Sequence, residues 1–309
     1  MSITISGGIT LNGGGWTIVA PPAGNKAIFG YGYGTAYTAI TNLVSNTGVV
    51  ATDTTGVGTV RGDLAAAGYG TDKAIFGYGR GASFTAITNL VSNTGVVATD
   101  TAGVGTARQS PAAAGYGTDK AIFGYGQNSG FAKVSMTNLV SNTGVVASDT
   151  TGVGTARNVL AAAGYGTDKA IFGYGLSTLR VSITNLVSNT GVVASDTTGV
   201  GTARQALAAA GYGTDKAIFG YGNDSTGSVT AITNLVSNTG VVATDTTGVG
   251  TAREYLAAAV YGTDKAIFGY GTTGTNVSMT NLVSNTGVVA TDTTGVGTAR
   301  GYLAAAAYG

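Results

Sequence analysis

Six near-identical copies of one module fill residues 26–309, and this repetition restricts the fold more than any other feature. Each copy runs from KAIFGYG through a variable stretch to (I/M)TNLVSNTGVVA, a run close to DTTGVGT, an Arg and a segment close to LAAAGYG. The copies begin 47 or 49 residues apart, which is the period of a propeller blade or a solenoid rung. Their first residues are Lys26, Lys73, Lys120, Lys169, Lys216 and Lys265.

Composition excludes several classes of function. Charged residues make up only 9% of the chain, the net charge is +1, and Lys and Arg are spread evenly over the copies, which argues against binding to nucleic acid or to an anionic membrane. Cysteine and histidine are absent, so disulfides, thiolate chemistry, His-ligated metals and His acid–base catalysis are excluded. We expect no cofactor, no metal and no membrane insertion, since no run approaches the ~20 apolar residues of a membrane span.

Four short strands can be placed in each module, because β-branched and aromatic residues alternate with turns that contain Gly, Asn or Asp. In the sixth copy we assign strand a to 303–308, b to 266–270, c to 277–283 and d to 288–292. Strand a has small side chains, as expected near a central axis, and strand b carries the large apolar groups that would join neighbouring blades. The sequence therefore predicts four-stranded antiparallel blades.

The ends of the array favour a closed ring over an open solenoid. The last copy is complete and ordinary, whereas an open solenoid would carry polar capping repeats. We predict an all-β, six-bladed β-propeller over residues 26–309, closed by the C-terminal strand joining the first blade. Residues 1–25 form a separate leader with the only Trp, Trp16, and no secretory signal is recognisable in it. Its segment 17–25 could compete with the C-terminal strand for the inner position in the first blade. An extra edge strand, a plug and a linkage to another chain all stay open as its role.

Two resemblances follow from these motifs. An Arg, a short strand ending in Gly-aromatic-Gly, and an apolar strand ending in Gly-Tyr-Gly together resemble the kelch repeat of β-propellers, although GYG replaces the usual Gly-Gly pair and the kelch Trp is missing. The nearly identical Gly/Thr/Asn-rich repeats, with the alternating Ile, Thr, Ser and Gly of the leader, are similar in style to phage tail-fibre and other virion adhesion proteins. That resemblance implies a virion or extracellular location.

The copies differ in two short windows. Window one follows GYG and covers residues 33–39, 80–86, 127–135, 176–182, 223–231 and 272–278. Window two follows the repeated Arg and covers residues 62–63, 109–110, 158–159, 205–206, 254–255 and 301–302. In an up-and-down blade the b-to-c and d-to-a connections leave from the same face, so both windows are expected on one face. Loop drift is the plain alternative, but it does not explain why the loops of the opposite face stay the same.

The windows also concentrate the side chains typical of binding surfaces. They contain aromatic residues, the basic residues without a repeated partner and the acids without one, among Ser, Thr, Gly and Asn, a mixture similar to a paratope. We therefore predict ligand binding by twelve residues. They are Tyr33, Tyr37, Asp63, Arg80, Phe84, Phe131, Lys133, Arg180, Asp224, Glu254, Tyr255 and Tyr302.

The repeated acids and arginines have two interpretations. One Asp and one Arg recur in every copy, and six pairings that tie blade to blade, or hydrogen bonds to turn backbones, are the structural interpretation. Six equivalent ligand sites, as in a propeller lectin, are the functional one. The DTTG string lacks the alternating acids of a calcium loop. The repeated residues are Asp53, Asp100, Asp149, Asp196, Asp245 and Asp292, with Arg61, Arg108, Arg157, Arg204, Arg253 and Arg300.

The sequence thus favours a non-enzymatic binding module, a receptor-binding or adhesion protein similar to a phage tail fibre. Its expected partner is a cell-surface protein or glycan, with other virion proteins contacted through the leader. A carbohydrate-binding propeller with repeated equivalent sites is the alternative. An enzyme is disfavoured because propeller sialidases need a Tyr/Glu pair and an Arg cluster, and this chain has a single Glu. Copper-radical oxidases need His and Cys, which the chain lacks.

Overall fold

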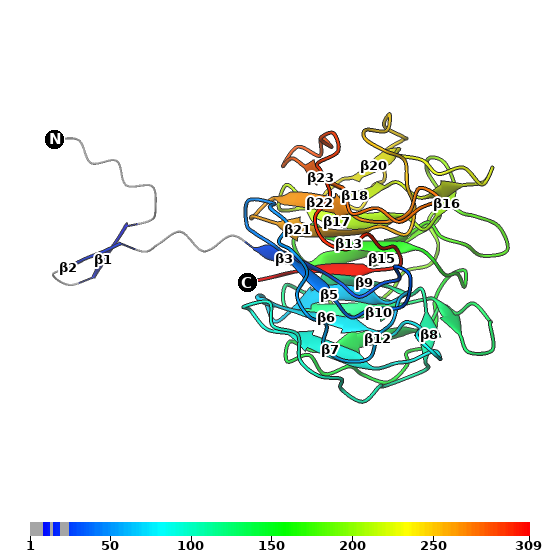
Figure 1. The fold of residues 1–309 in the computed structure, drawn as a ribbon, viewed down its shortest axis with the longest axis horizontal. Coiled ribbons are helices and arrows are strands. Elements are labelled where there is room, and N and C mark those ends of the chain that lie inside the picture. Colours follow the sequence, from blue (N-terminus) through cyan, green and yellow to red (C-terminus); the bar gives the residue numbers. More distant parts are fainter. Residues whose placement is uncertain (1–8, 13–14, 19–24) are drawn as a thin grey trace.

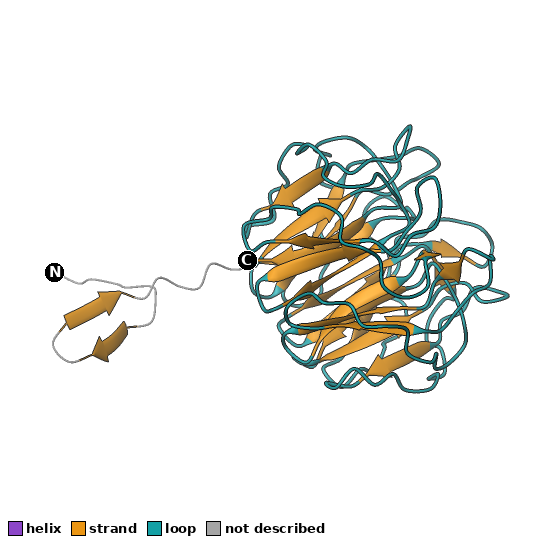
Figure 2. Cartoon of the chain, turned by 90° about the horizontal axis from the view of Figure 1, so that it is seen from below, coloured by secondary structure: helices purple, strands orange, loops and turns teal. Residues whose placement is uncertain are grey.

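The computed structural model describes residues 9–12, 15–18 and 25–309. All regular secondary structure in these ranges is β-strand, and Figure 2 shows strands joined by long loops. Among these residues there is no helix with the length and apolar character needed to cross a bilayer. The all-β class and the repeated organisation predicted from the sequence are confirmed.

Residues 26–309 form six equivalent three-stranded antiparallel sheets. The middle strand of each sheet is the KAIFG segment, and these strands are β3 (Lys26–Gly30), β6 (Lys73–Gly77), β10 (Lys120–Gly124), β14 (Lys169–Gly173), β18 (Lys216–Gly220) and β22 (Lys265–Gly269). The outer strand is TNLV, in β4 (Thr41–Val44), β7 (Thr88–Val91), β12 (Thr137–Val140), β15 (Thr184–Val187), β20 (Thr233–Val236) and β23 (Thr280–Val283).

The inner strand of each sheet comes from the end of the preceding copy. These strands are β5 (Ala65–Tyr69), β9 (Ala112–Tyr116), β13 (Ala161–Tyr165), β17 (Ala208–Tyr212), β21 (Ala257–Tyr261) and β24 (Ala304–Tyr308). Each inner strand packs beside the next, and β24 packs beside both β21 and β5, so the six inner strands close into a ring. Small residues such as Gly68 and Gly115 line the central hole, in agreement with the prediction for strand a.

The C-terminal strand closes the ring, as predicted. β24 pairs with β3 from Ala304 opposite Gly30 to Tyr308 opposite Lys26, the register that every other inner strand makes with its middle strand. Figure 1 shows the two ends of the colour scale, blue β3 and the red C-terminal strand, side by side. The first and last copies therefore share one sheet, and the array has no free inner edge.

The prediction of a fourth regular strand is wrong. In the sixth copy the segment assigned to strand d, 288–292, makes one isolated bridge, Val289 with Val283, and Thr293 just after it makes another, with Thr280. The following residues leave the sheet and reach the neighbouring copy, where the backbone N–H of Thr298 donates to Asp53. A segment that crosses between copies cannot extend the pairing of its own sheet. Strand c is also shorter than predicted and covers Thr280–Val283.

Aromatic packing joins each sheet to the next. The Phe76 ring of the second copy lies 5.1 Å from the Tyr31 ring of the first, in an edge-on arrangement. A Cβ atom on Gly30 would lie 2.6 Å from Phe76 Cζ, so this strand position must be glycine for the rings to approach. The contacts recur around the ring, and they confirm that strand b supplies the apolar groups between copies.

Part of the leader is described. β1 (Ile9–Asn12) and β2 (Gly15–Ile18) pair as an antiparallel hairpin, with Leu11 opposite Trp16. The remaining leader residues 1–8, 13–14 and 19–24 lie outside the described residues, so the three roles considered for the leader stay predictions. Its last residue, Asn25, forms a bridge to Gly262 next to the ring.

Candidate binding face

A buried arginine links each copy to the next beneath the two windows. Arg61 of the first copy is fully buried, and its Nη2 donates to Asn89 Oδ1 of the second copy at 2.7 Å. Its Nε donates to the Tyr78 carbonyl at 2.9 Å, and its guanidinium lies 4.3 Å from the centroid of the Tyr31 ring. The contact from Arg300 to Asn42 repeats this link between the sixth and first copies. Arginine thus ties the copies together around the closed ring.

The repeated aspartate completes this link. Asp100 accepts hydrogen bonds from the Thr59 hydroxyl of the first copy at 2.6 Å and from Asn89 of its own copy at 2.9 Å. Burial alone would raise the pKa of Asp100, but these hydrogen bonds outweigh it and lower the pKa. Where the pair is closest, Arg108 Nη1 lies 3.8 Å from Asp149 Oδ1. The structural interpretation of the repeated Asp and Arg residues is therefore confirmed.

The two windows meet on one face of the ring, which we call the variable face. Window two of one copy pairs with window one of the next, as where Gly62 and Arg80 exchange backbone hydrogen bonds of 2.9 and 2.8 Å. Window one is longer in the third and fifth copies. There, its pairing with window two of the preceding copy extends to a short two-stranded sheet. These sheets join β8 (Arg108–Gln109) to β11 (Gln127–Asn128), and β16 (Arg204–Gln205) to β19 (Asn223–Asp224).

The second residues of window two form a hydrogen-bonded ring around the centre of the variable face. The N–H of Ser110 donates to the Asp63 carbonyl at 2.7 Å, the N–H of Asp63 donates to the Tyr302 carbonyl at 2.9 Å, and the same bond continues through the remaining copies. All six residues have a left-handed backbone, with φ between 49° and 58°, although none is glycine. They are Asp63, Ser110, Val159, Ala206, Tyr255 and Tyr302.

This ring surrounds a cavity of about 730 Å³ that opens on the variable face. Below it lies a pit of about 70 Å³, whose floor is made by the residues that follow window two, among them Leu64, Leu160 and Leu207. Asp63 and Tyr302 line both spaces, so the pit continues the cavity along the axis. The centre of the variable face is therefore a polar basin with an apolar floor.

Seven of the twelve predicted residues line the large cavity. Their side chains come from five of the six copies, and only Tyr255 and Tyr302 are the same residue at equivalent positions. Tyr255 and Tyr302 stack with ring centroids 3.9 Å apart, and Tyr33 lies edge-on to Tyr37 at 5.1 Å. The seven residues are Tyr33, Tyr37, Asp63, Arg80, Lys133, Tyr255 and Tyr302.

The other five predicted residues lie in the windows but outside the lining of this cavity. Phe84 and Phe131 pack edge-on at 5.6 Å, and Phe131 is 66% exposed. Arg180 donates to Asn223, and the carboxylate of Asp224 is occupied by its own loop, accepting the N–H of Thr226 at 2.9 Å.

Glu254 is the last of these five residues. Burial raises the pKa of Glu254, and the charge of Arg180 opposes this rise. Arg180, Asp224 and Glu254 therefore form an outlying charged group beside the cavity.

Sequence reasoning missed the amide side chains of the cavity. Gln109, Gln127, Asn158 and Gln205 all line it, and all stand in the same windows as the predicted residues. Their residue type gave no signal, because Asn and Gln are uncharged and common in loops. Window position alone would have identified them.

Asp63 is the only acid of the cavity lining. Burial raises the pKa of this carboxyl. The hydrogen bond from Ser110 and the charge of Arg80 oppose this rise but do not cancel it. Ser110 Oγ donates to Asp63 Oδ1 at 3.0 Å. The acid is thus held beneath the cavity and is partly compensated by a cation from the next copy.

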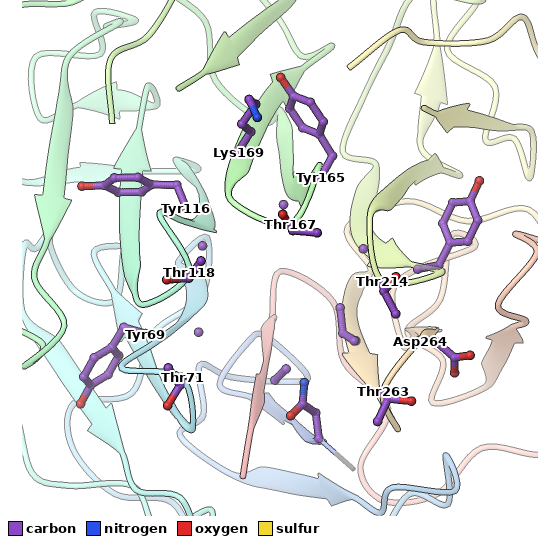
Figure 3. A pocket seen from close by; sticks show the side chains of 18 of the residues that line it. Tyr69, Thr71, Tyr116, Thr118, Tyr165, Thr167, Lys169, Thr214, Thr263 and Asp264 are labelled. Carbon is purple, nitrogen blue, oxygen red and sulfur yellow. The ribbon is translucent and has the colours of Figure 1, made fainter. Parts of the chain in front are cut away.

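The opposite face, which we call the turn face, has a cavity of a different kind. A space of about 330 Å³ opens at the axis, and Figure 3 shows Thr71, Thr118, Thr167, Thr214 and Thr263 arranged around it. The four lysines that line it form ion pairs with the preceding aspartates, with Nζ–Oδ1 distances from 2.7 to 2.9 Å. Residues that recur in nearly every copy line this cavity, whereas residues that vary among the copies line the cavity of the variable face.

Nothing among the described residues forms a cluster of metal-ligating side chains. No family model matches the chain, and no curated protein is similar to it. The geometry of the two faces is therefore the guide to function.

Proposed function

We propose that the chain is a six-bladed β-propeller that acts as a non-enzymatic binding module, with the variable face as its contact surface. One observation carries this proposal: side chains that differ from copy to copy converge on a single cavity, while the turn face keeps the same residues. A fixed ring that holds different loops toward one space has the architecture of a recognition surface.

The rigidity of the scaffold supports the same proposal. Each buried Arg and each repeated Asp makes hydrogen bonds across a junction between copies, so the windows stand on a closed framework. Because these groups are used within the scaffold, they are poor candidates for six equivalent sugar sites. The lectin alternative with repeated sites therefore has less support than a single non-repeated site.

The proposed partner is a cell-surface receptor, either protein or glycan. Exposed aromatic and basic residues such as Tyr33, Phe131 and Arg80 are those that contribute most at binding surfaces. The likeness of the repeats to kelch modules and to tail-fibre proteins supports an adhesion role on a virion or at another extracellular location. In that setting the leader would join the ring to other proteins of the assembly.

A symmetrised variant tests this function. Window one of every copy is replaced by that of the fourth copy, 176–182, and window two by the segment that pairs with it, 158–159 of the third copy. The strands and the turn face stay intact. We expect cooperative unfolding to persist and binding to receptor-bearing cells to disappear, because the non-repeated side chains are gone. Retained cell binding by a folded symmetrised variant would contradict the proposal.

A further inference from the structure

Two amide side chains of the variable-face cavity lack hydrogen-bond partners. Asn158 Oδ1 and Gln205 Oε1 are buried and have none within the described part of the chain, and Asn158 is only 6% exposed. A buried amide oxygen without a donor costs about 1–3 kcal/mol. Rotation about the last side-chain bond exchanges the oxygen and nitrogen of an amide, so either group can be turned toward the cavity that both residues line.

Neighbouring amides show that the shortage of donors is local. Gln109 Nε2 donates to Gln127 Oε1 at 2.8 Å, and Gln127 Nε2 donates to the Phe131 carbonyl at 2.9 Å. Gln109 and Gln127 thus find their hydrogen-bond partners within the protein, whereas the oxygens of Asn158 and Gln205 need donors from a ligand. Ligand hydroxyl groups are suitable, since each can donate to one amide and accept from another.

Flat aromatic surfaces stand across the same cavity. The stacked rings of Tyr255 and Tyr302 are half-buried and project into it, and Tyr33 and Tyr37 extend the aromatic sector. Tyrosine combines an apolar face with a polar end and loses little conformational entropy on binding. A ring with an apolar C–H face and hydroxyls along its edge matches both the tyrosine and the amide sectors.

The charge of the lining selects further among such ligands. Two cations, Arg80 and Lys133, face one acid, Asp63, so the lining is formally positive. Arg80 is exposed, and its only side-chain hydrogen bond in the described residues is a long one of 3.4 Å to Gln109. Most of its five N–H donors are thus free, and a planar guanidinium suits bidentate binding of a carboxylate.

We propose that the variable-face cavity binds a saccharide that carries a carboxylate, as a uronate or sialate unit does. The sugar ring lies on the tyrosine sector, its hydroxyls pair with Asn158 and Gln205, and its carboxylate is bound by Arg80. This inference rests on the proposed function, because it names the ligand of that same face. It differs from a repeated lectin site in predicting one saccharide per chain.

Titration of the full chain with defined oligosaccharides tests the inference. The probes are uronate- and sialate-terminated oligosaccharides, each compared with its carboxyl-reduced counterpart. We expect one site per chain and preference for the acid form. Arg80→Gln should reduce affinity for the acid by about tenfold to a hundredfold and abolish the preference, since charge-assisted hydrogen bonds are lost. Lys216→Gln on the turn face is the control that removes the same charge and should leave affinity unchanged.

Two further variants separate binding from folding. Tyr302→Ala should weaken binding of the acid and reduced sugars alike by about tenfold, whereas Tyr302→Phe keeps the stack and should weaken binding much less. Asn158→Leu should lower affinity by about tenfold while raising the melting temperature, because it removes an unpaired buried amide. If Asn158 had only a structural role, the substitution would not lower affinity while raising the melting temperature.

Failure of the inference can be distinguished from failure of the proposed function. If no acid saccharide binds, or if Arg80→Gln and Lys216→Gln behave alike, the saccharide assignment is overturned. If cell binding in that case still depends on the windows, the variable face remains a binding surface for a protein. If cell binding is unchanged when the windows are replaced, both proposals are contradicted.

Discussion

At the scale of single residues, the stability of the ring depends on buried polar groups that have specific partners. Arg157 illustrates this, because its Nε and Nη2 bind the Tyr174 carbonyl at 2.8 Å and Asn185 Oδ1 at 2.7 Å in the next copy. Removing the guanidinium leaves both acceptors buried without a donor. Interactions of this type are worth far more than exposed ion pairs, which contribute about 0–1 kcal/mol.

We predict that Arg157→Leu lowers the free energy of unfolding by about 3 kcal/mol or more, because it leaves buried acceptors unpaired. The matched control is Lys169→Leu, which removes an exposed cation paired with Asp168 on the turn face. That control should cost far less stability, because its ion pair is exposed to solvent. Denaturant titration of both variants measures the difference, and equal losses would contradict a special role for the buried arginine.

The left-handed ring residues give a second prediction at this scale. Val159 has φ of 53°, a conformation that costs a side-chain-bearing residue about 1–2 kcal/mol. Val159→Gly should therefore raise the melting temperature, and Ala206→Gly, which lacks branching at Cβ, should raise it less. A lower melting temperature for Val159→Gly would show that packing of the valine outweighs the backbone strain.

The pH dependence of stability tests two carboxyls with opposite pKa shifts. Hydrogen bonds from Thr155 and Asn185 outweigh burial and lower the pKa of Asp196, so its contribution is present at neutral pH and is lost as pH falls through the folded-state pKa. Burial raises the pKa of Asp63, so its ionisation destabilises the folded state as pH rises above the unfolded-state pKa.

At pH 7 we therefore expect Asp196→Asn to be less stable than the natural chain and Asp63→Asn to be more stable. Both differences should shrink toward acid pH, where the carboxyls are protonated in the folded and unfolded states. Thermal melts between pH 7 and pH 3 provide the measurement. Differences of the same sign for the two variants would refute the assigned environments.

At the scale of elements, closure depends on β24, since it supplies the inner strand for β3 and β4. Deleting residues 303–309 should expose the edge of β3 and abolish cooperative unfolding of the monomer, or force pairing between two chains. A truncated chain that stays monomeric and melts cooperatively would contradict this role.

A circular permutant is the matched control for this deletion. It begins at Lys73, ends at Asp72, and joins Gly309 to Lys26 through the residues Thr and Asp, restoring the YGTDK turn of the other copies. It leaves out the leader and moves the break to an equivalent junction, but it keeps every strand of the six three-stranded sheets. We expect it to fold with a stability near that of the natural chain, as measured by denaturant titration.

Most, but not all, of the strands could be predicted from the sequence. Repetition and turn residues predicted the three regular strands of each sheet and the closing position of the last one. They failed for the fourth strand, because Thr59 and Thr298 bind an aspartate of the neighbouring copy and draw their segments away from the sheet. A contact between copies leaves no mark on the local pattern from which strands are predicted.

At the scale of the whole molecule, variation among the copies was the most informative signal for function. It predicted that Tyr302 and Arg80 lie on one face, although they are more than two hundred residues apart in sequence, and the structure brings both to one cavity. It did not separate Asn158 from the surrounding loop residues, since only the three-dimensional arrangement shows that its oxygen lacks a donor. The same arrangement showed that Asp224 serves its own loop.

The proposed function requires that one face of the ring binds and the other does not. Since the chain has no cysteine, a single introduced cysteine can carry a bulky maleimide label at one chosen place. Thr178 is exposed in window one on the variable face, and Thr94 is exposed in an SNTG turn on the turn face. We predict that labelled Thr178→Cys no longer binds receptor-bearing cells, whereas labelled Thr94→Cys binds as the unlabelled chain does. Binding blocked only from the turn face, or from neither face, would contradict the account.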